Sequence, residues 1–476
     1  MSARPIIATL LTSFLVATSH VYAFDVLRTT NGISATAAGA IVPDPLACQF
    51  GSPGKPLLLA EAVQRALCSN PKTREAWADV KAQAAGLGVA RAAYLPTLSG
   101  TAQVVRDNSV TDVIDHPTLS SAQLATTNME SVSLNWTLYD FGARAAAARN
   151  ASALLAAAQS TQNATLQSLF VAVAKDYYAA QAAAGALAAA EDVERMSGDS
   201  AKVASARVDK GIAPISDALQ AQTAYMQAVL SRNKAQGAWQ SAAGTLASDM
   251  ELSPDVPITL PAVTAGVQPD TAFTESVGEL IDEATHAHPS VLAAQAEVDA
   301  AVAKVDQTRA QGLPNISLVS KYSRDNQPAS LGLGIPEFPA TGHEWYVGVQ
   351  VTIPFFEGFT RTYQIRQTQA QLEKQRDALE DARQQVGLEV WNSYQAVQTS
   401  TDSVKDSATL LDIAQRSFTA AQHRYQAGVG NILELLNAQT ALANAQQQRV
   451  QALADWRAAR LRLAGSLGRL SGDDMQ

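Results

Sequence analysis

Residues 131–144 read SVSLNWTLYDFGAR, and this stretch decides how the chain folds. Apolar and polar side chains alternate through it, with Val132, Leu134, Trp136 and Leu138 on one face. A period of two predicts a β-strand that has one apolar and one polar face. The alternation stops at Tyr139-Asp140, where a long Ala-rich segment begins. The stretch therefore marks the passage from a strand into a helix.

The same pattern returns in residues 345–361, which read WYVGVQVTIPFFEGFTR. Matching residues of the two stretches are 217 positions apart, and matches at that offset continue along the chain: Tyr139-Asp140 with Phe356-Glu357, Arg144 with Arg361, Arg207 with Arg424, Gly211 with Gly428, and Gln222-Thr223 with Gln439-Thr440. Before the strands the offset is 218, as in Asn70-Pro71 and His288-Pro289. One structural unit is therefore used twice.

The repeat predicts the domain organisation. Residues 57–251 form the first repeat and 276–468 the second, separated by a Pro-rich linker at 252–275. Residues 1–23 combine Arg4, an apolar run and Val21-Tyr22-Ala23, which predicts a cleaved export signal. Residues 24–56 are then an N-terminal leader and 469–476 a C-terminal tail.

Each repeat has the same predicted order of elements. A first helix (57–94 and 276–311) ends at Leu-Pro, and two strands follow. A very long helix (141–210 and 359–427) is broken at Gly211 or Gly428, and a return helix (214–250 and 431–468) completes the unit. Apolar residues repeat every seven positions in the second long helix, with one step of four: Ile365, Leu372, Leu379, Val386, Val390, Val397, Val404, Leu411, Phe418 and Tyr425. This stripe predicts coiled-coil packing with a stutter.

Composition and motifs exclude several classes of protein. The net charge of -9 argues against a protein that coats nucleic acid. The sequence contains no phosphate-binding glycine loop, no His-Glu-x-x-His and no Gly-x-Ser-x-Gly, so we expect no enzyme and no cofactor. His286 and His288 are two positions apart on a helix and face different ways, which predicts no metal site.

Cys48 and Cys68 are the only cysteines. An even number of cysteines in an exported chain predicts a disulfide, which would tie the leader to the first helix. The alternative is lipidation at Leu46-Ala47-Cys48, although that motif lies about 30 residues beyond the apolar run it should follow.

The strands predict a membrane β-barrel. Their one-sided apolar character and flanking aromatic residues fit a barrel with aromatic girdles, here Trp136, Tyr139, Trp345, Tyr346, Phe355 and Phe356. The alternative is a soluble sheet edge packed on helices. Four strands cannot close a barrel around a lumen, and open edges are not tolerated in lipid. Identical chains must therefore share one barrel, and three chains would supply twelve strands.

The ordered set of motifs resembles the TolC family of outer-membrane factors, also called outer membrane efflux proteins. The resemblance is carried by Leu-Pro before each first strand, Leu138-Tyr139-Asp140-Phe141-Gly142, and residues 207–223 and 424–440. It implies a mainly α fold with a membrane β part. It also implies a homotrimer whose shared 12-stranded barrel stands on an α-helical coiled-coil tunnel that extends into the periplasm. Partners would be a periplasmic adaptor protein and an inner-membrane ABC transporter or efflux pump.

Within the family, the leader from Cys48 to Cys68, with Leu59-Ala60-Glu61-Ala62-Val63, looks like the CyaE-like type I secretion branch. This resemblance implies an exit duct for a repeat-rich exported protein. Two alternatives stay open: the outer-membrane component of a drug or metal efflux pump, and a periplasmic helical scaffold without a pore.

The resemblance also implies a periplasmic aperture at the turns after the long helices. It places Asp217, Glu434 and Asn437 at the acidic positions of that aperture, with Asn437 departing from members that carry a second carboxylate. The alternative is local helix capping by Asn431 with Glu434, and by Asp217 after Pro214. The exposed tips are the expected adaptor contacts: Gly211, Ile212, Ala213, Pro214, Gly428, Val429, Gly430 and Asn431.

Overall fold

The computed structural model describes residues 25–39, 41–42, 44–53, 55–263, 276–327, 329, 338 and 340–470. The predicted export signal, the second half of the linker and the end of the tail lie outside these residues. The chain divides into two compact units. The first takes in Met1–Ile33, Lys81–Leu155 and Asp299–Glu373, and the second takes in Ser34–Val80, Ala156–Val298 and Lys374–Gln476. The domain boundaries drawn from the sequence stay a prediction.

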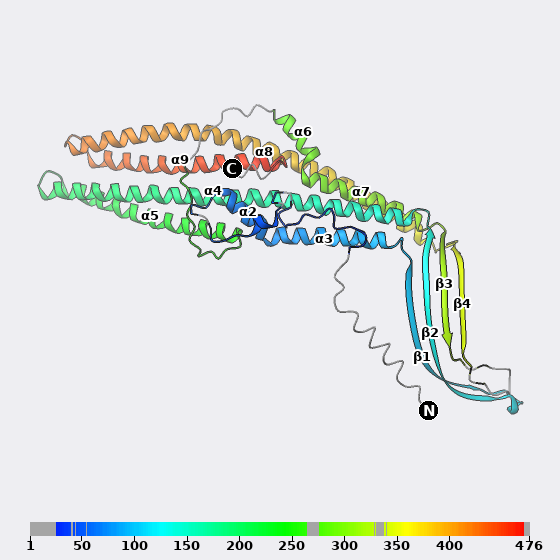
Figure 1. Cartoon of the computed structure of the whole chain (residues 1–476). Helices are drawn as coiled ribbons and strands as arrows, with labels where there is room; N and C mark the ends of the chain where they lie inside the picture. The colour runs from blue at the N-terminus through cyan, green and yellow to red at the C-terminus, as the bar shows by residue number, and fades with distance from the viewer. Residues whose placement is uncertain are drawn as a thin grey trace. The chain divides into compact units, whose positions relative to one another are not determined.

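The duplication is visible in the lengths of the helices (Figure 1). The long helices α4 and α8 each have 67 residues, and the return helices α5 and α9 each have 35. The helices before the strands match in the same way, with 11 residues in α2 and α6 and 22 in α3 and α7. Their bounds are α2 Leu59–Ser69, α3 Pro71–Ala92, α4 Ala143–Asp209, α5 Ile215–Asp249, α6 Val277–Ala287, α7 Pro289–Ala310, α8 Thr360–Gln426 and α9 Ile432–Ser466.

Each predicted first helix is two helices, which corrects the sequence expectation. Asn70 separates α2 from α3, and His288 separates α6 from α7. Both residues have extended backbone, with ψ of 135°, because a proline follows each of them and excludes the helical conformation. The Asn70 Oδ1 then accepts from the Lys72 amide at 3.0 Å and starts the next helix. His288 Nδ1 does the same for the Ser290 amide at 3.2 Å.

The first unit contains one antiparallel sheet of order β1-β2-β3-β4 (Figure 1). Its strands are β1 Thr97–Thr111, β2 Ser121–Tyr139, β3 Asn315–Asp325 and β4 Gly342–Thr352. The central pairing brings the two repeats together, since β2 pairs with β3. Within the described ranges, no helix is both long enough and apolar enough to cross a bilayer.

The heptad stripe predicted for α8 is confirmed by burial. All ten of its apolar residues are buried or half-buried, and Val390, at the four-residue step, is fully buried. The return helix α9 buries its own stripe at Leu435, Leu442 and Leu463. Arg449 interrupts that stripe and donates to the Val404 carbonyl oxygen, and burial lowers its pKa. The helices therefore pack through the faces that the sequence marks.

Besides the packing of α8 and α9, the second unit has a hydrophobic core where α2, α4 and the end of α5 meet. Phe170 and Leu246 are fully buried there, together with Leu57 and Leu67. The Tyr177 hydroxyl donates to the Leu57 carbonyl oxygen at 2.9 Å. This core fixes the chain that enters α2 against the long helix.

Two carboxyl groups lie close together beside this core. Asp249, the last residue of α5, has an Oδ2 atom that is buried without a hydrogen-bond partner. Burial and the neighbouring Asp176 of α4 raise the pKa of Asp249 to about 6, and Lys72 lowers it slightly. Asp249 also lies at the C-terminal end of α5, where the helix dipole disfavours a negative charge. Asp249 therefore favours its protonated form at mildly acidic pH.

This pair makes the stability of the chain depend on pH. The folded-state pKa of Asp249 lies above its ordinary value of 3.8, so the folded state binds more protons between pH 3.8 and about 6. The free energy of unfolding should therefore fall as pH rises through that window. Asp249→Asn should reduce the fall in melting temperature between about pH 4 and pH 7.5. Exposed Glu75→Gln is the control; an unchanged pH dependence in Asp249→Asn would contradict the interpretation.

Candidate functional site: sheet face, strand–helix junctions and helix turns

One face of the sheet is apolar and exposed. Paired residues of antiparallel strands share a face, so the register defines it: Leu98 pairs with Leu134, Trp136 with Leu318, Leu318 with Val349, and Tyr322 with Trp345. Leu98, Val349 and Trp345 are 71 %, 63 % and 70 % exposed. A polar row of Glu130, Arg324 and His343 follows and ends the apolar band. From Ile316 to Tyr322 the band is about 20 Å long, close to the height that a membrane barrel presents to lipid.

The opposite face is polar. Ser99 and Ser133 share a hydrogen bond at 2.8 Å, and Thr101 and Ser131 share another at 2.8 Å. The register places Tyr346 beside Lys321 on this face, away from Trp345. Of the residues predicted for the aromatic girdle, Tyr346 thus lies on the polar face. Trp136 and Trp345 lie on the apolar face, and Tyr139, Phe355 and Phe356 lie near the strand–helix junctions with exposed rings.

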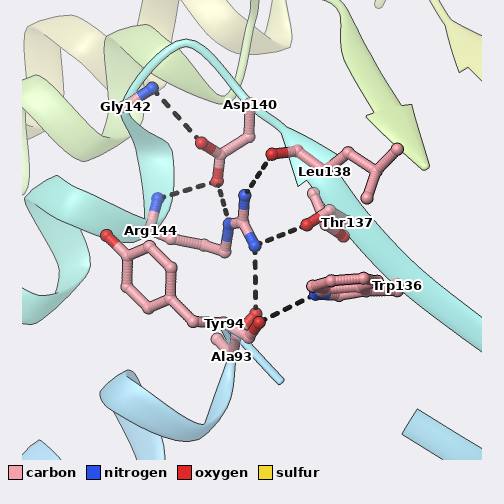
Figure 2. Close-up of polar contacts among 8 residues, drawn as sticks. All are labelled: Ala93, Tyr94, Trp136, Thr137, Leu138, Asp140, Gly142 and Arg144. Carbon is pink, nitrogen blue, oxygen red and sulfur yellow. Dashed lines mark hydrogen bonds and ion pairs between the residues drawn. The ribbon is translucent and has the colours of Figure 1, made fainter. Parts of the chain in front are cut away.

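Arg144, in the first turn of α4, is the centre of the junction between β2 and α4 (Figure 2). Its Nε donates to Asp140 Oδ2 at 2.9 Å, and the two side chains are only 14 % and 16 % exposed. The guanidinium lies over the Tyr94 ring, 4.8 Å from its centroid. Its other N–H groups donate to carbonyl oxygens of Thr137 at 2.6 Å, Leu138 at 3.2 Å and Ala93 at 3.5 Å. The Arg144 side chain therefore joins the end of β2, the turn at Asp140, the end of α3 and the start of α4.

The turn itself has an unusual backbone. Phe141 and Gly142 have φ of 50° and 92°, a region that is unfavourable by about 1–2 kcal/mol for a residue with a side chain. Asp140 holds this turn by accepting from the amides of Gly142 at 3.3 Å and Arg144 at 2.9 Å (Figure 2). Trp136 Nε1 also donates to the Tyr94 carbonyl oxygen at 2.9 Å, which fixes the end of the strand.

The second repeat has a looser version of the same junction. Arg361 pairs with Glu357 at 3.2 Å, and their side chains are 24 % and 36 % exposed. Its guanidinium reaches only one backbone carbonyl, that of Thr308, at 3.4 Å. The sequence showed these arginines as repeat matches; their bonds to carbonyl oxygens become visible only in the fold.

The predicted tips are tight turns at the ends of the long helices. Gly211 and Gly428 have φ of 69° and 81°, as expected of residues that end a helix in the left-handed conformation. Gly430 is needed for a different reason, because a Cβ there would lie 3.0 Å from backbone atoms of Arg424 and Tyr425. Ile212, Pro214 and Val429 are exposed at the same turns, and Asn431 begins α9.

Of the residues predicted for the aperture, Asp217 and Glu434 lie in the first turns after these tips, and Asn437 lies in the second turn of α9. Asn431 Oδ1 accepts from the amides of Leu433 and Glu434, so it caps α9. Glu434 pairs with Arg424 at 3.2 Å instead of completing a capping box. Asp217 lies in the first turn of α5 and accepts from the Ser216 hydroxyl at 3.5 Å, while Asn437 is exposed on α9. Of the two predicted aperture carboxylates, Glu434 thus has a basic partner, Arg424.

Helices α4 and α5 form a first helical hairpin, and α8 and α9 form a second. A contact between these two hairpins lies beside the turns and was not predicted. Arg207 of α4 donates to the Tyr425 carbonyl oxygen of α8 at 2.5 Å, and its guanidinium lies 4.9 Å from the centre of the Tyr425 ring. Burial raises the pKa of Tyr425, Arg207 lowers it, and Asp217 raises it. The only signal in the sequence was the repeated spacing of an arginine four positions before each glycine.

The leader is attached to α2 at several points. A disulfide joins Cys48 and Cys68, whose Cα atoms are 5.6 Å apart. Buried Arg65 donates to the Gly51 carbonyl oxygen at 2.9 Å and lies over the Phe50 ring. Residues 48–51 of the leader are therefore held against α2 within the second unit.

Comparison with known families identifies the chain. A model of the family described as "Outer membrane efflux protein" matches residues 62–249 and 280–469. The chain belongs to this family. The predicted fold class, mainly α with a membrane β part as in TolC, is confirmed, and so is the location in the outer membrane with a periplasmic extension. Members of the family are channels, so this outer membrane efflux protein is not an enzyme.

Two curated relatives cover most of the chain, and a third covers less than half. Protein CyaE of Bordetella pertussis is 32 % identical over 420 residues, which are 88 % of this chain and 86 % of CyaE. Outer membrane efflux protein BepC of Brucella suis is 26 % identical over 421 residues, 88 % of this chain and 86 % of BepC. Alkaline protease secretion protein AprF of Pseudomonas aeruginosa is 28 % identical over 199 residues, 41 % of this chain and 40 % of AprF.

Solved structures show the same fold. The outer membrane protein VceC of Vibrio cholerae has a TM-score of 0.71 at 19 % identity, with 86 % of this chain and 96 % of VceC covered. The Campylobacter jejuni CmeC outer membrane channel has a TM-score of 0.73 at 15 % identity, with 87 % and 86 % covered.

Arg144 should be the most sensitive residue of the strand–helix junction. Arg144→Met removes the guanidinium that pairs with Asp140 and donates to three carbonyl oxygens, and should destabilise the protein by about 3 kcal/mol. The temperature at which the folded protein loses its compact gel mobility measures this. Arg149→Met is the control, because Arg149 pairs with Asp306 at the surface and should contribute less than about 1 kcal/mol. Equal losses in the two variants would contradict a special role for Arg144.

Proposed function

We propose that this outer membrane channel is the exit duct of a type I secretion system that exports a protein. The similarity to CyaE over nearly the whole chain carries the proposal. The leader and α2 support it, because these are the residues that resemble the CyaE-like secretion branch. The partial similarity to AprF, whose name describes protease secretion, points the same way.

The proposed assembly is a homotrimer. β1 and β4 each have one edge without a partner strand in the described sheet. Unpaired backbone groups are too unfavourable in lipid for a sheet with open edges to lie there. Pairing of β1 with β4 of another copy satisfies both edges, and three copies give twelve strands, a number within the range of known barrels. Energy and cargo selection would then come from an inner-membrane ABC transporter through a periplasmic adaptor protein that contacts the turns at 211–214 and 428–431.

Small-molecule efflux is the second candidate. BepC, which covers the same share of the chain, is named an efflux protein. The sheet and the helix turns have no feature that selects between a polypeptide and a small solute. The two candidates differ in cargo rather than in the way the channel is built.

We further propose that Asp217 and Glu434 line the periplasmic aperture. Their charges are unequal in effect, because Glu434 forms an ion pair with Arg424 at 3.2 Å. Asp217 lies near Tyr425, and its charge raises the pKa of that phenol, so the carboxylate acts across the gap between the hairpins. Asp217 should therefore contribute more to cation selectivity than Glu434 does.

The choice between secretion and efflux is tested by deleting the gene in its native host. We expect loss of one large exported protein from the culture medium and unchanged susceptibility to drugs and metal salts. Restoring the intact gene should restore secretion, whereas Arg144→Met should restore it only in part. Normal secretion combined with increased drug susceptibility would decide for the efflux pump.

The aperture proposal is tested by reversal potentials in planar bilayers under a salt gradient. Asp217→Asn should lower cation selectivity clearly, Glu434→Gln should lower it less, and Arg424→Gln should raise it. The control is Glu75→Gln with Asp402→Asn, two exposed carboxylates away from the turns. Identical reversal potentials for Asp217→Asn and the control would remove Asp217 from the aperture.

A further inference from the structure

His288 separates α6 from α7 and is buried, with only 9 % of its surface exposed. Its Nδ1 atom accepts from the Ser290 amide at 3.2 Å, so the side chain is the N-cap of α7. The ring also forms a hydrogen bond with the backbone of Gly465, in the last turn of α9. A ring nitrogen that accepts carries no proton, so the imidazole is neutral and its other nitrogen is the donor to Gly465. One buried neutral imidazole therefore links the start of α7 to the end of α9.

The chain that follows α9 lies directly against this break. Gly468, two residues beyond α9, has φ of 72°. A Cβ on Gly468 would lie 2.9 Å from Pro289 Cδ and 3.3 Å from His288 Cα. Gln167, an uncharged residue of α4, donates to the Gly468 carbonyl oxygen at 2.8 Å. The break between α6 and α7 is therefore packed on backbone atoms whose own hydrogen bonds hold them in place.

The charged and titratable groups around His288 come from α6, α8 and the chain after α9. Glu389 of α8 is exposed, and its negative charge favours the protonated ring. Glu283 of α6 is paired at 2.8 Å with Arg469, the residue after Gly468. His286 of α6 is exposed. Burial outweighs the effect of Glu389 and lowers the pKa of His288 below its ordinary value of 6.5.

The first repeat has the same break with a side chain that does not titrate. Asn70 stands between α2 and α3, and its Oδ1 accepts from the Lys72 amide at 3.0 Å. An ion pair at 2.6 Å between Arg74 and Glu251 joins the start of α3 to the chain after α5. Asn70 keeps its acceptor at every pH, whereas His288 loses its acceptor when Nδ1 is protonated. The duplication therefore supplies an acid-insensitive reference for the break at His288.

We propose that His288 is a pH-sensitive joint between α6, α7 and the end of α9. In its neutral form the imidazole caps α7 and bonds to the end of α9. Protonation places an N–H group where the Ser290 amide needs an acceptor, so two donors face each other and the cap is lost. In acid the start of α7 therefore opens locally, while the equivalent start of α3 stays closed.

Acid should weaken this joint, and the direction follows from proton binding. His288 binds its proton more weakly in the folded chain than in the unfolded one, so the unfolded state takes up more protons as pH falls below 6.5. The stability that the neutral ring contributes is present above pH 6.5 and is lost below it. Asp249 acts in the opposite direction, because its raised pKa stabilises the folded state in acid. A melting temperature of the whole chain therefore mixes the two effects, and a local measurement is needed.

Hydrogen exchange, followed by mass spectrometry on the full-length protein in detergent, tests the joint. Peptides that cover residues 288–292 and 70–74 are compared at about pH 7.5 and about pH 5, on either side of the ordinary titration of histidine. After correction for the intrinsic pH dependence of exchange, the protection of 288–292 should fall about fivefold in acid, the effect of losing a helix N-cap. The protection of 70–74 should stay unchanged.

Two variants separate His288 from the other groups that titrate. His288→Asn copies the cap of the first repeat, so the protection of 288–292 should become equal at the two pH values. His286→Asn removes the exposed histidine two positions away and should leave the acid response as it is. Equal protection of 288–292 at both pH values in the native chain, or the same fall in His288→Asn, would overturn the joint.

The comparison of the two breaks within the native chain decides the question even when His288→Asn fails to fold. A fall in protection that is equal at 288–292 and 70–74 would also count against His288, because Asn70 cannot titrate. The measurement needs neither cargo nor conductance, so each of these results leaves the channel function standing.

Discussion

The structure depends on one constraint: a four-stranded sheet with an exposed apolar face and two unpaired edges cannot be stable alone in water or in lipid. Its apolar band is bounded by the row of Glu130, Arg324 and His343, and its edges are β1 and β4. The apolar face needs lipid and the edges need other strands. The outer membrane supplies the lipid that the apolar face needs, so the location of the protein and the exposure of this face have the same physical cause.

The strand–helix junctions show how the two repeats have diverged. In the first repeat, Arg144 is half-buried and bonded to three carbonyl oxygens, so the turn with left-handed Phe141 is held firmly. In the second repeat, Arg361 is more exposed and bonded to one. A buried charge is stable only when its hydrogen bonds are satisfied, which explains why the carboxylate, the guanidinium and the carbonyl oxygens occur together.

The hairpins have diverged in the opposite direction. The second hairpin buries Phe418 at its seam, whereas the equivalent residue of the first hairpin is buried Ala201. Small residues allow close approach of helices but bury little apolar area. Exposed Leu219 and Met226 add apolar surface on the outer side of the first hairpin. The first repeat therefore has the more tightly bonded strand–helix junction, and the second repeat has the larger buried side chains in its helical hairpin.

The sequence by itself determined the features that repeat at a fixed period. The alternation of apolar and polar residues predicted the two faces of β2 and β4. The seven-residue spacing of apolar residues predicted the buried stripe of α8, and the duplication predicted the order of elements. Local backbone rules also contained the break before Pro71, although the predicted helix ran through it. Only the tertiary structure decided that Arg207 bonds Tyr425, that Arg424 takes Glu434 as its partner, and that Gln439 is buried while Gln222 is exposed. Periodicity reports which face of an element is buried. The partners of Arg207 and Gln439 lie more than two hundred residues away in the sequence, and no local pattern records their approach.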